Sequence, residues 1–128
     1  MRILLDTCMV LWWMNDSPEL TPSERESISD PANDVYVSAA SAWEVEIKRK
    51  LGKLDLPDEW KDAVADTGFR WLNVLPHHTE GLRTLPDIHR DPFDRMIVAQ
   101  AKSESMTVLT HDSKVLAYLD DENRDVRR

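Results

Sequence analysis

Arg2-Ile3-Leu4-Leu5-Asp6, at the start of the chain, is a short apolar run that stops at a carboxylate. Such a run is typical of a buried strand in a parallel sheet. Near the other end, Thr107-Val108-Leu109-Thr110 has the same character and leads through one residue to Asp112. Ligands of open parallel sheets bind where the strands end. The two strand-terminal acids, Asp6 and Asp112, are therefore predicted to share one crevice.

The segments between these two strands continue the alternation of strands and helices. Val35–Val37 and Phe69–Leu75 are predicted as further strands because they are rich in β-branched and aromatic residues. Capping residues and apolar periodicity place seven helices, which are expected to begin near Met9, Pro22, Ser38 or Ser41, Pro57, His77, Pro92 and Ser113. This order predicts an α/β fold: one three-layer α/β/α domain over residues 1–119, with a central, mainly parallel sheet of four to five strands.

Composition narrows the class of protein. The 128 residues fit one domain, and the formal net charge of −8 argues against a basic face that coats nucleic acid. The lone cysteine, Cys8, excludes an internal disulfide and a cysteine-based zinc site, and is expected to be a buried small residue. Since no stretch approaches the ~20 apolar residues of a membrane span, a cytoplasmic protein without membrane contact is expected. The charged segment 120–128 is predicted to be a tail.

Two further acids are candidates for the same crevice. Glu44 follows the second strand on a helix whose apolar positions Trp43, Ile47 and Leu51 recur at i, i+4 and i+8. Trp43 and Ile47 are expected to be buried beside Glu44, with a dimer surface as the alternative place for Trp43. Asp94 lies just inside the helix that opens at Pro92, near its apolar stripe. Four converging carboxylates repel one another strongly. A hard divalent cation such as Mg²⁺ or Mn²⁺ relieves that repulsion.

Each of these residues also has an ordinary structural interpretation. Asp6, Asp91 and Asp112 can cap helices, and Glu44 can pair with Lys48 one turn away. The four histidines lack the i, i+4 pairing of a helical zinc site. We interpret His77-His78 as a solvated helix start. His89 and His111 are expected either in a second layer, where they contact the acids and not the metal, or on the surface.

Four segments carry a resemblance to a known family. They are Leu5-Asp6-Thr7, Ser41-Ala42-Trp43-Glu44-Val45 with Lys48, His89-Arg90-Asp91-Pro92-Phe93-Asp94-Arg95, and Leu109-Thr110-His111-Asp112. Their order and spacing resemble a PIN domain and are similar to the VapC-type toxins of prokaryotic toxin–antitoxin pairs. The resemblance covers about residues 2–118, and the segment around Asp94 is its most specific part.

The resemblance implies a metal-dependent endoribonuclease that a cognate antitoxin silences and that forms a homodimer. Asp6, Glu44, Asp94 and Asp112 match the four family acids that hold Mg²⁺ or Mn²⁺, with Asp6 and Asp94 favoured as direct ligands. Thr110 matches a supporting hydroxyl position, and Asp91 is a possible auxiliary acid. Basic residues outside the crevice are weaker candidates for contacts with RNA phosphates: Lys48, Arg49, Lys50 and Lys53.

Two alternatives from other classes stay open at this point. The first is a non-catalytic binding module of the same fold, whose acidic pocket binds a basic segment of a partner. The second is a phosphoacceptor signalling domain, which is disfavoured because the late strand runs into Thr110-His111-Asp112 where a lysine is needed. The family often ends in a further strand, whereas residues 120–124 show no strand pattern, so the closing edge strand is expected to be absent or rebuilt.

Overall fold

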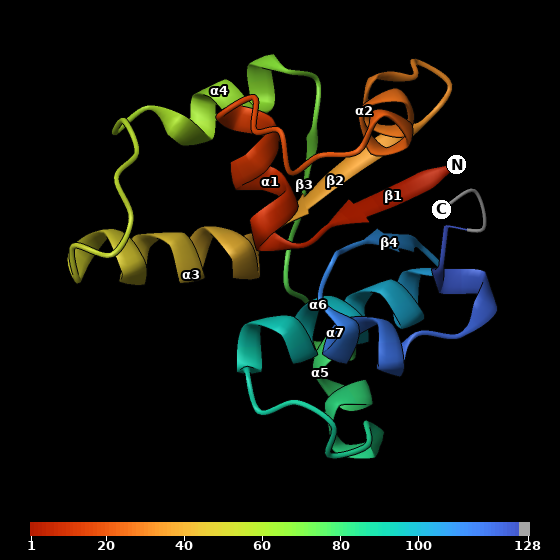
Figure 1. Cartoon of the computed structure of the whole chain (residues 1–128). Coiled ribbons are helices and arrows are strands. Elements are labelled where there is room, and N and C mark those ends of the chain that lie inside the picture. The colour runs from red at the N-terminus through yellow and green to blue at the C-terminus, as the bar shows by residue number, and fades with distance from the viewer. Residues whose placement is uncertain (126–128) are drawn as a thin grey trace.

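Four parallel strands form a single sheet at the centre of the molecule (Figure 1). The computed structural model describes residues 1–125. The strands are β1 (Arg2–Leu5), β2 (Asp34–Ser38), β3 (Arg70–Leu72) and β4 (Thr107–Leu109), in the order β3-β2-β1-β4. All three pairings are parallel, as the alternation of strands and helices predicted.

Helices connect the strands and cover both faces of the sheet (Figure 1). They are α1 (Thr7–Met14), α2 (Pro22–Ser29), α3 (Ala39–Lys50), α4 (Trp60–Asp66), α5 (Pro76–Glu80), α6 (Pro92–Glu104) and α7 (Ser113–Tyr118), with short 3₁₀ helices η1 (Gly81–Thr84) and η2 (Asp121–Asn123). No helix within residues 1–125 is long and apolar enough to cross a membrane.

Burial on both faces of β1 explains the three layers. Successive side chains of a strand point to opposite faces. Ile3 and Leu5 join one apolar cluster with residues of α1, α2 and α4, whereas Leu4 joins a second cluster with residues of α6 and α7. All three are fully buried. An uninterrupted apolar strand is therefore required here, and Arg2–Leu5 supplies it.

Several expected boundaries differ from the structure. The third strand is Arg70–Leu72, shorter than the predicted Phe69–Leu75. The chain leaves the sheet after Leu72 because its backbone bonds to side chains instead of to a strand. The Asn73 carbonyl accepts from the side-chain amide of Gln100, and the N–H of Leu75 donates to Nδ1 of His78 on α5. The helix expected over 77–85 divides into α5 and η1.

Trp43 and Ile47, on the apolar stripe of α3, were predicted to be buried, and this prediction is wrong. Trp43 is 65% exposed, Ile47 39% and Leu51 63%. The face that packs inward instead carries Ser41, Glu44 and their buried neighbours. Hydrogen bonds from Thr7 to Ser41 and Glu44 hold that polar face against α1, so the stripe is turned outward.

Two further burial predictions are wrong. Cys8 is exposed, because Met9 and Val10 are the residues of α1 that face the core. His78, expected to be solvated, is fully buried, since its ring bonds to the N–H of Leu75 and to Glu104.

Candidate active site

The carboxyl ends of β1 and β4 bring the first two acids together. Leu5 is in register with Leu109, and the N–H of Asp6 donates to the Leu109 carbonyl at 3.2 Å. Asp112 follows three residues after that carbonyl. The two strand-terminal acids therefore lie at one edge of the sheet, as the parallel arrangement predicted.

Three aspartates around this edge also cap helices. Asp6 Oδ1 accepts from the N–H of Met9 at 2.9 Å, and Asp112 Oδ1 accepts from that of Lys114 at 2.8 Å. Asp91 Oδ1 accepts from the first turn of α6. The structural interpretation of these acids is thus correct. It does not exclude a role in metal binding, because a carboxylate has a second oxygen with which to bind a ligand.

Thr110 connects two of the acids. It is fully buried, and its hydroxyl oxygen accepts from the N–H of Asp112 at 3.0 Å. The hydroxyl also bonds to the Asp6 carboxylate, which lowers the pKa of Asp6. Burial of the carboxylate raises the pKa of Asp6 more strongly than this hydrogen bond lowers it, and the charge of Asp112 raises it further. The net result is a raised pKa. A nearby cation would therefore stabilise the ionised form of Asp6.

Glu44 reaches the same edge from α3. It is 6% exposed; its Oε1 accepts from the Thr7 hydroxyl at 2.7 Å, and its Oε2 lies 2.8 Å from Lys48 Nζ. The hydrogen bond to Glu44 raises the pKa of Lys48, so this ammonium stays charged. The predicted i, i+4 pair is present, and it places one positive charge beside the acids. Neither Thr7 nor Ser41, which bonds to Thr7, carried a functional signal in the sequence.

Asp94 is also strongly affected by its surroundings. Its pKa is raised to about 6, first by burial and then by the charges of Asp91, Asp6 and Glu44. Charges act in this way only at short range. The raised pKa is therefore evidence that the acids from β1, α3 and α6 converge, and that their mutual repulsion is only partly relieved within the protein.

His89 completes the arrangement. Its Nε2 lies 2.9 Å from Asp94 Oδ2 and 3.9 Å from Asp112 Oδ2. The Tyr118 hydroxyl bonds to the backbone N–H and carbonyl of His89, and Arg95 bonds to the same carbonyl. The sequence analysis expected His89 either in a second layer around the acids or on the surface. The structure places it beside two of the candidate acids, which agrees with the first of these.

The loop before α7 is supported from α2. His111, between Thr110 and Asp112, lies 2.8 Å from both carboxylate oxygens of Glu24, which is fully buried. Glu24 also bonds back to the N–H of Thr21 in the predicted capping box. This chain of contacts links the position of the Asp112 loop to the start of α2.

The basic candidates lie in different places. Lys48 is at the site, beside Glu44. Arg49 is directed elsewhere: its guanidinium bonds to Glu46, Asp58 and the carbonyl of Leu56. Lys53 is exposed in the loop after α3, beyond Lys50 at the end of that helix.

Cys8 lies close to the acids, which is a position that the sequence did not indicate. Although the residue is exposed, its sulfur is partly shielded from water, and this desolvation, followed by the charges of Asp6 and Glu44, raises the pKa of Cys8 to about 11. The thiol is therefore neutral at pH 7 and is a poor nucleophile.

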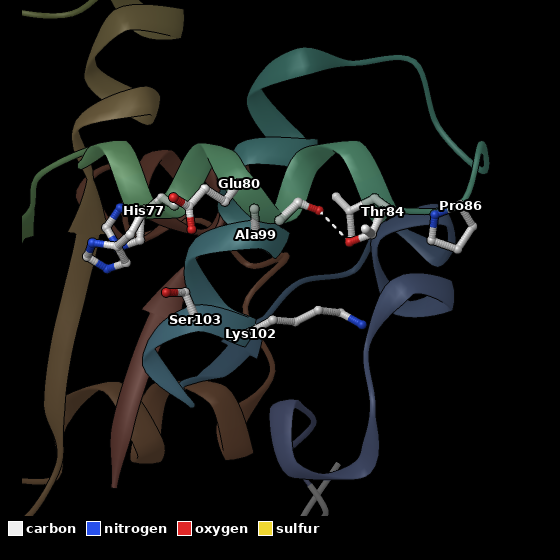
Figure 2. Close-up of a pocket in the computed structure, with 10 residues that line it drawn as sticks. His77, Glu80, Thr84, Pro86, Ala99, Lys102 and Ser103 are labelled. Carbon is white, nitrogen blue, oxygen red and sulfur yellow. Dashed lines mark hydrogen bonds between the residues drawn. The ribbon is translucent and has the colours of Figure 1, made fainter.

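A cavity of about 510 Å³ lies between α6 and the α5–η1 segment. Figure 2 shows His77 and Glu80 on one side of it and Ala99, Lys102 and Ser103 on the other. None of the four candidate acids lines this cavity.

The fold and the acidic edge define a PIN domain, and the chain belongs to the PIN domain family, whose model matches residues 3–121. Among solved structures, the chain is similar to one described as VapBC2 from Rickettsia felis bound to a DNA fragment from their promoter. The TM-score is 0.68 at 15% identity, over 92% of this chain and 93% of that one. No curated protein matches the sequence.

Proposed function

We propose that this PIN domain is a metal-dependent endoribonuclease that acts as the toxin of a toxin–antitoxin pair. The observation that carries the proposal is that carboxylates from β1, α3 and α6 gather at one edge of the sheet, with Lys48 beside them. Their mutual repulsion is in keeping with the raised pKa of Asp94. Such a site favours a divalent cation.

The donor set fits Mg²⁺ or Mn²⁺. These ions prefer oxygen ligands, and the four proposed residues, Asp6, Glu44, Asp94 and Asp112, supply carboxylates. When bound, the cation supplies an activated water and offsets negative charge at the scissile phosphate. Asp6 and Asp94 are proposed as direct ligands.

The remaining residues orient and balance this site. Thr110 fixes the Asp6 carboxylate and the backbone of Asp112, and Thr7 fixes Glu44. Asp91 is proposed as an auxiliary acid that holds the start of α6 and raises the proton affinity of Asp94. The cation also resolves the contradiction between an acidic protein and an RNA substrate, because it bridges two negative partners.

Lys48 is the basic residue best placed to contact an RNA phosphate, because its ammonium is already at the acidic edge. Arg49 and Lys53 would contact only flanking nucleotides.

A cognate antitoxin and a second copy of the chain are proposed as partners in the cytoplasm. The exposed stripe of Trp43, Ile47 and Leu51 supports a protein partner, since an apolar helix face left in water is unfavourable. The similar solved structure is itself described as VapBC2.

The test is cleavage of total cellular RNA by the purified protein with Mg²⁺, with Mn²⁺ and with EDTA. Asp94→Asn removes one proposed ligand, and Asp87→Asn makes the same change at an exposed position before α6. We expect discrete cleavage that requires metal, falls at least about 100-fold in Asp94→Asn and is unchanged in Asp87→Asn.

Absence of cleavage by folded, metal-loaded protein would contradict the nuclease proposal. It would favour the binding module whose acidic pocket holds a basic partner segment. Cleavage that persists in EDTA or in Asp94→Asn would show that these acids are not the metal site.

A further inference from the structure

The side chain of His89 is the feature of this site that the carboxylate arrangement does not explain. Its ring is 18% exposed and lies against two proposed metal ligands, Asp94 and Asp112. Its Nε2 and one oxygen of each acid lie within 4.8 Å of one another. An imidazole in this position is a potential ligand in its own right.

We infer that His89 is itself a metal ligand, so that the site is a mixed nitrogen–oxygen site. This inference rests on the proposed function, since it concerns the same cation. Two donor atoms bound to one ion at about 2.1 Å and at right angles lie about 3.0 Å apart. The 2.9 Å between His89 Nε2 and Asp94 Oδ2 matches that separation. Asp112 Oδ2 is farther from His89 Nε2, at 3.9 Å. Asp112 would therefore bind the same cation after a small rotation of its side chain, or through a water molecule.

The tautomer required of His89 is available. A neutral imidazole has one N–H and one lone pair, so Nε2 binds a metal only when the proton is on Nδ1. Within residues 1–125, Nδ1 of His89 has no hydrogen-bond partner that would prevent this. A bound cation would replace the contact between Nε2 and Asp94 Oδ2, and the neutral imidazole would then carry its proton on Nδ1.

The backbone of His89 is already fixed for such a role. The Tyr118 hydroxyl is 2.8 Å from the N–H and 3.0 Å from the carbonyl of this residue. Arg95 donates to the Tyr118 hydroxyl and to the carbonyls of Pro86 and His89. The loop before α6 is therefore held without any contribution from the imidazole, which leaves the ring available for a ligand.

A second histidine cluster in the structure shows why His89 differs. His77, His78 and Glu104 also place three donor atoms within 4.8 Å. Nδ1 of His78 accepts from the N–H of Leu75 at 3.0 Å, so its proton is on Nε2 and points to Glu104 Oε1 at 2.9 Å. His78 consequently has no lone pair left for a cation, and this cluster is a structural hydrogen-bond network.

A nitrogen ligand changes which cation binds best. Oxygen-only sites suit Mg²⁺, whereas imidazole favours the later first-row metals. We therefore expect the site to prefer Mn²⁺ over Mg²⁺, and Co²⁺ or Ni²⁺ over both in binding affinity.

The test is pulsed electron paramagnetic resonance of the Mn²⁺-loaded protein, which detects a directly bound ¹⁴N nucleus as modulation of the spin echo. We expect nitrogen modulation in the native chain and in His77→Gln, and its loss in His89→Gln. As a second readout, titration calorimetry should show that His89→Gln lowers the Ni²⁺:Mg²⁺ affinity ratio at least about tenfold. Circular dichroism checks that each variant is folded. If His89→Gln is unfolded, the native and His77→Gln spectra still decide whether nitrogen is bound.

The outcomes separate this inference from the proposed function. If Mn²⁺ binds without nitrogen modulation, His89 is not a ligand and the carboxylate site is kept. The same conclusion follows if the modulation persists in His89→Gln or disappears in His77→Gln. Failure of the native chain to bind Mn²⁺ would overturn both.

Discussion

The aspartates of this PIN domain show that a strand-end carboxylate can cap a helix with one oxygen and still offer the other to a ligand. Asp6 and Asp112 each use Oδ1 to cap the helix that follows a strand. Capping fixes the carboxylate at a strand end, where ligands of parallel sheets bind. A pattern of acids in sequence therefore cannot separate the two roles, because the same geometry serves both.

Asp94 provides a prediction at this scale. In metal-free protein at pH 7.5, Asp94→Asn should raise the free energy of unfolding by about 1–2 kcal/mol, allowing for partial exposure of the side chain. Its carboxyl has a pKa of about 6 in the fold against about 3.9 in the unfolded chain. Ionised Asp94 thus destabilises the fold above pH 6, and the penalty disappears as pH falls from 6 towards 4.

Urea unfolding in EDTA at pH 7.5 and at pH 5 measures this difference. The gain from Asp94→Asn should be smaller at pH 5, and Asp87→Asn should show no gain at either pH. An equal loss of stability at both values would mean that Asp94 is not repelled by its neighbours.

Single residues were the least predictable part of the site. The four candidate acids were predicted from their order and spacing, and the structure gathers them at one edge. Thr7 was assigned no role and His89 only a place in a second layer or on the surface, because the spacing of a hydroxyl or an imidazole does not show what it will contact. Their importance comes from contacts between elements that are far apart in sequence.

At the scale of elements, α3 shows what periodicity leaves open. Apolar residues at i, i+4 and i+8 correctly indicate a helix, and Trp43, Ile47 and Leu51 do share one face. The pattern does not say whether this face meets the sheet or another molecule. Polar contacts from α1 decided the orientation here, and such contacts are invisible in a hydrophobic pattern.

The contrast between two tryptophans tests this orientation. Trp60→Ala should cost about 3–5 kcal/mol of unfolding free energy, because Trp60 is 1% exposed and packs against Trp71. Trp43→Ala should cost less than about 1 kcal/mol in the monomer, because Trp43 is 65% exposed and packs edge-on against Phe93. Urea unfolding of both variants measures the difference. Comparable losses would show that the stripe of α3 is buried in solution.

At the scale of the whole molecule, the sequence predicted the architecture well. Continuous apolar strands, each followed by a helix, require a parallel sheet covered on both faces, and this is what the structure shows. The edges were harder. The short third strand ends where side chains of α5 and α6 bond to its backbone. The C-terminal segment forms one parallel bridge, Val108 with Arg124, although its composition shows no strand pattern.

The last prediction concerns how that C-terminal segment belongs to the fold. Asn123 is fully buried, and its amide donates to the carbonyls of Met106 at 2.9 Å and Ala101 at 3.3 Å, around the turn from α6 to β4. Asn123→Ala leaves the Met106 carbonyl without this donor and should cost about 1–3 kcal/mol of unfolding free energy. Asp121→Ala, at an exposed position of η2, should be nearly neutral. Equal effects of the two changes in urea unfolding would mean that the cooperative domain ends near residue 119. A selective loss of stability in Asn123→Ala would mean that the cooperative domain extends through the segment that bridges to β4 at Val108.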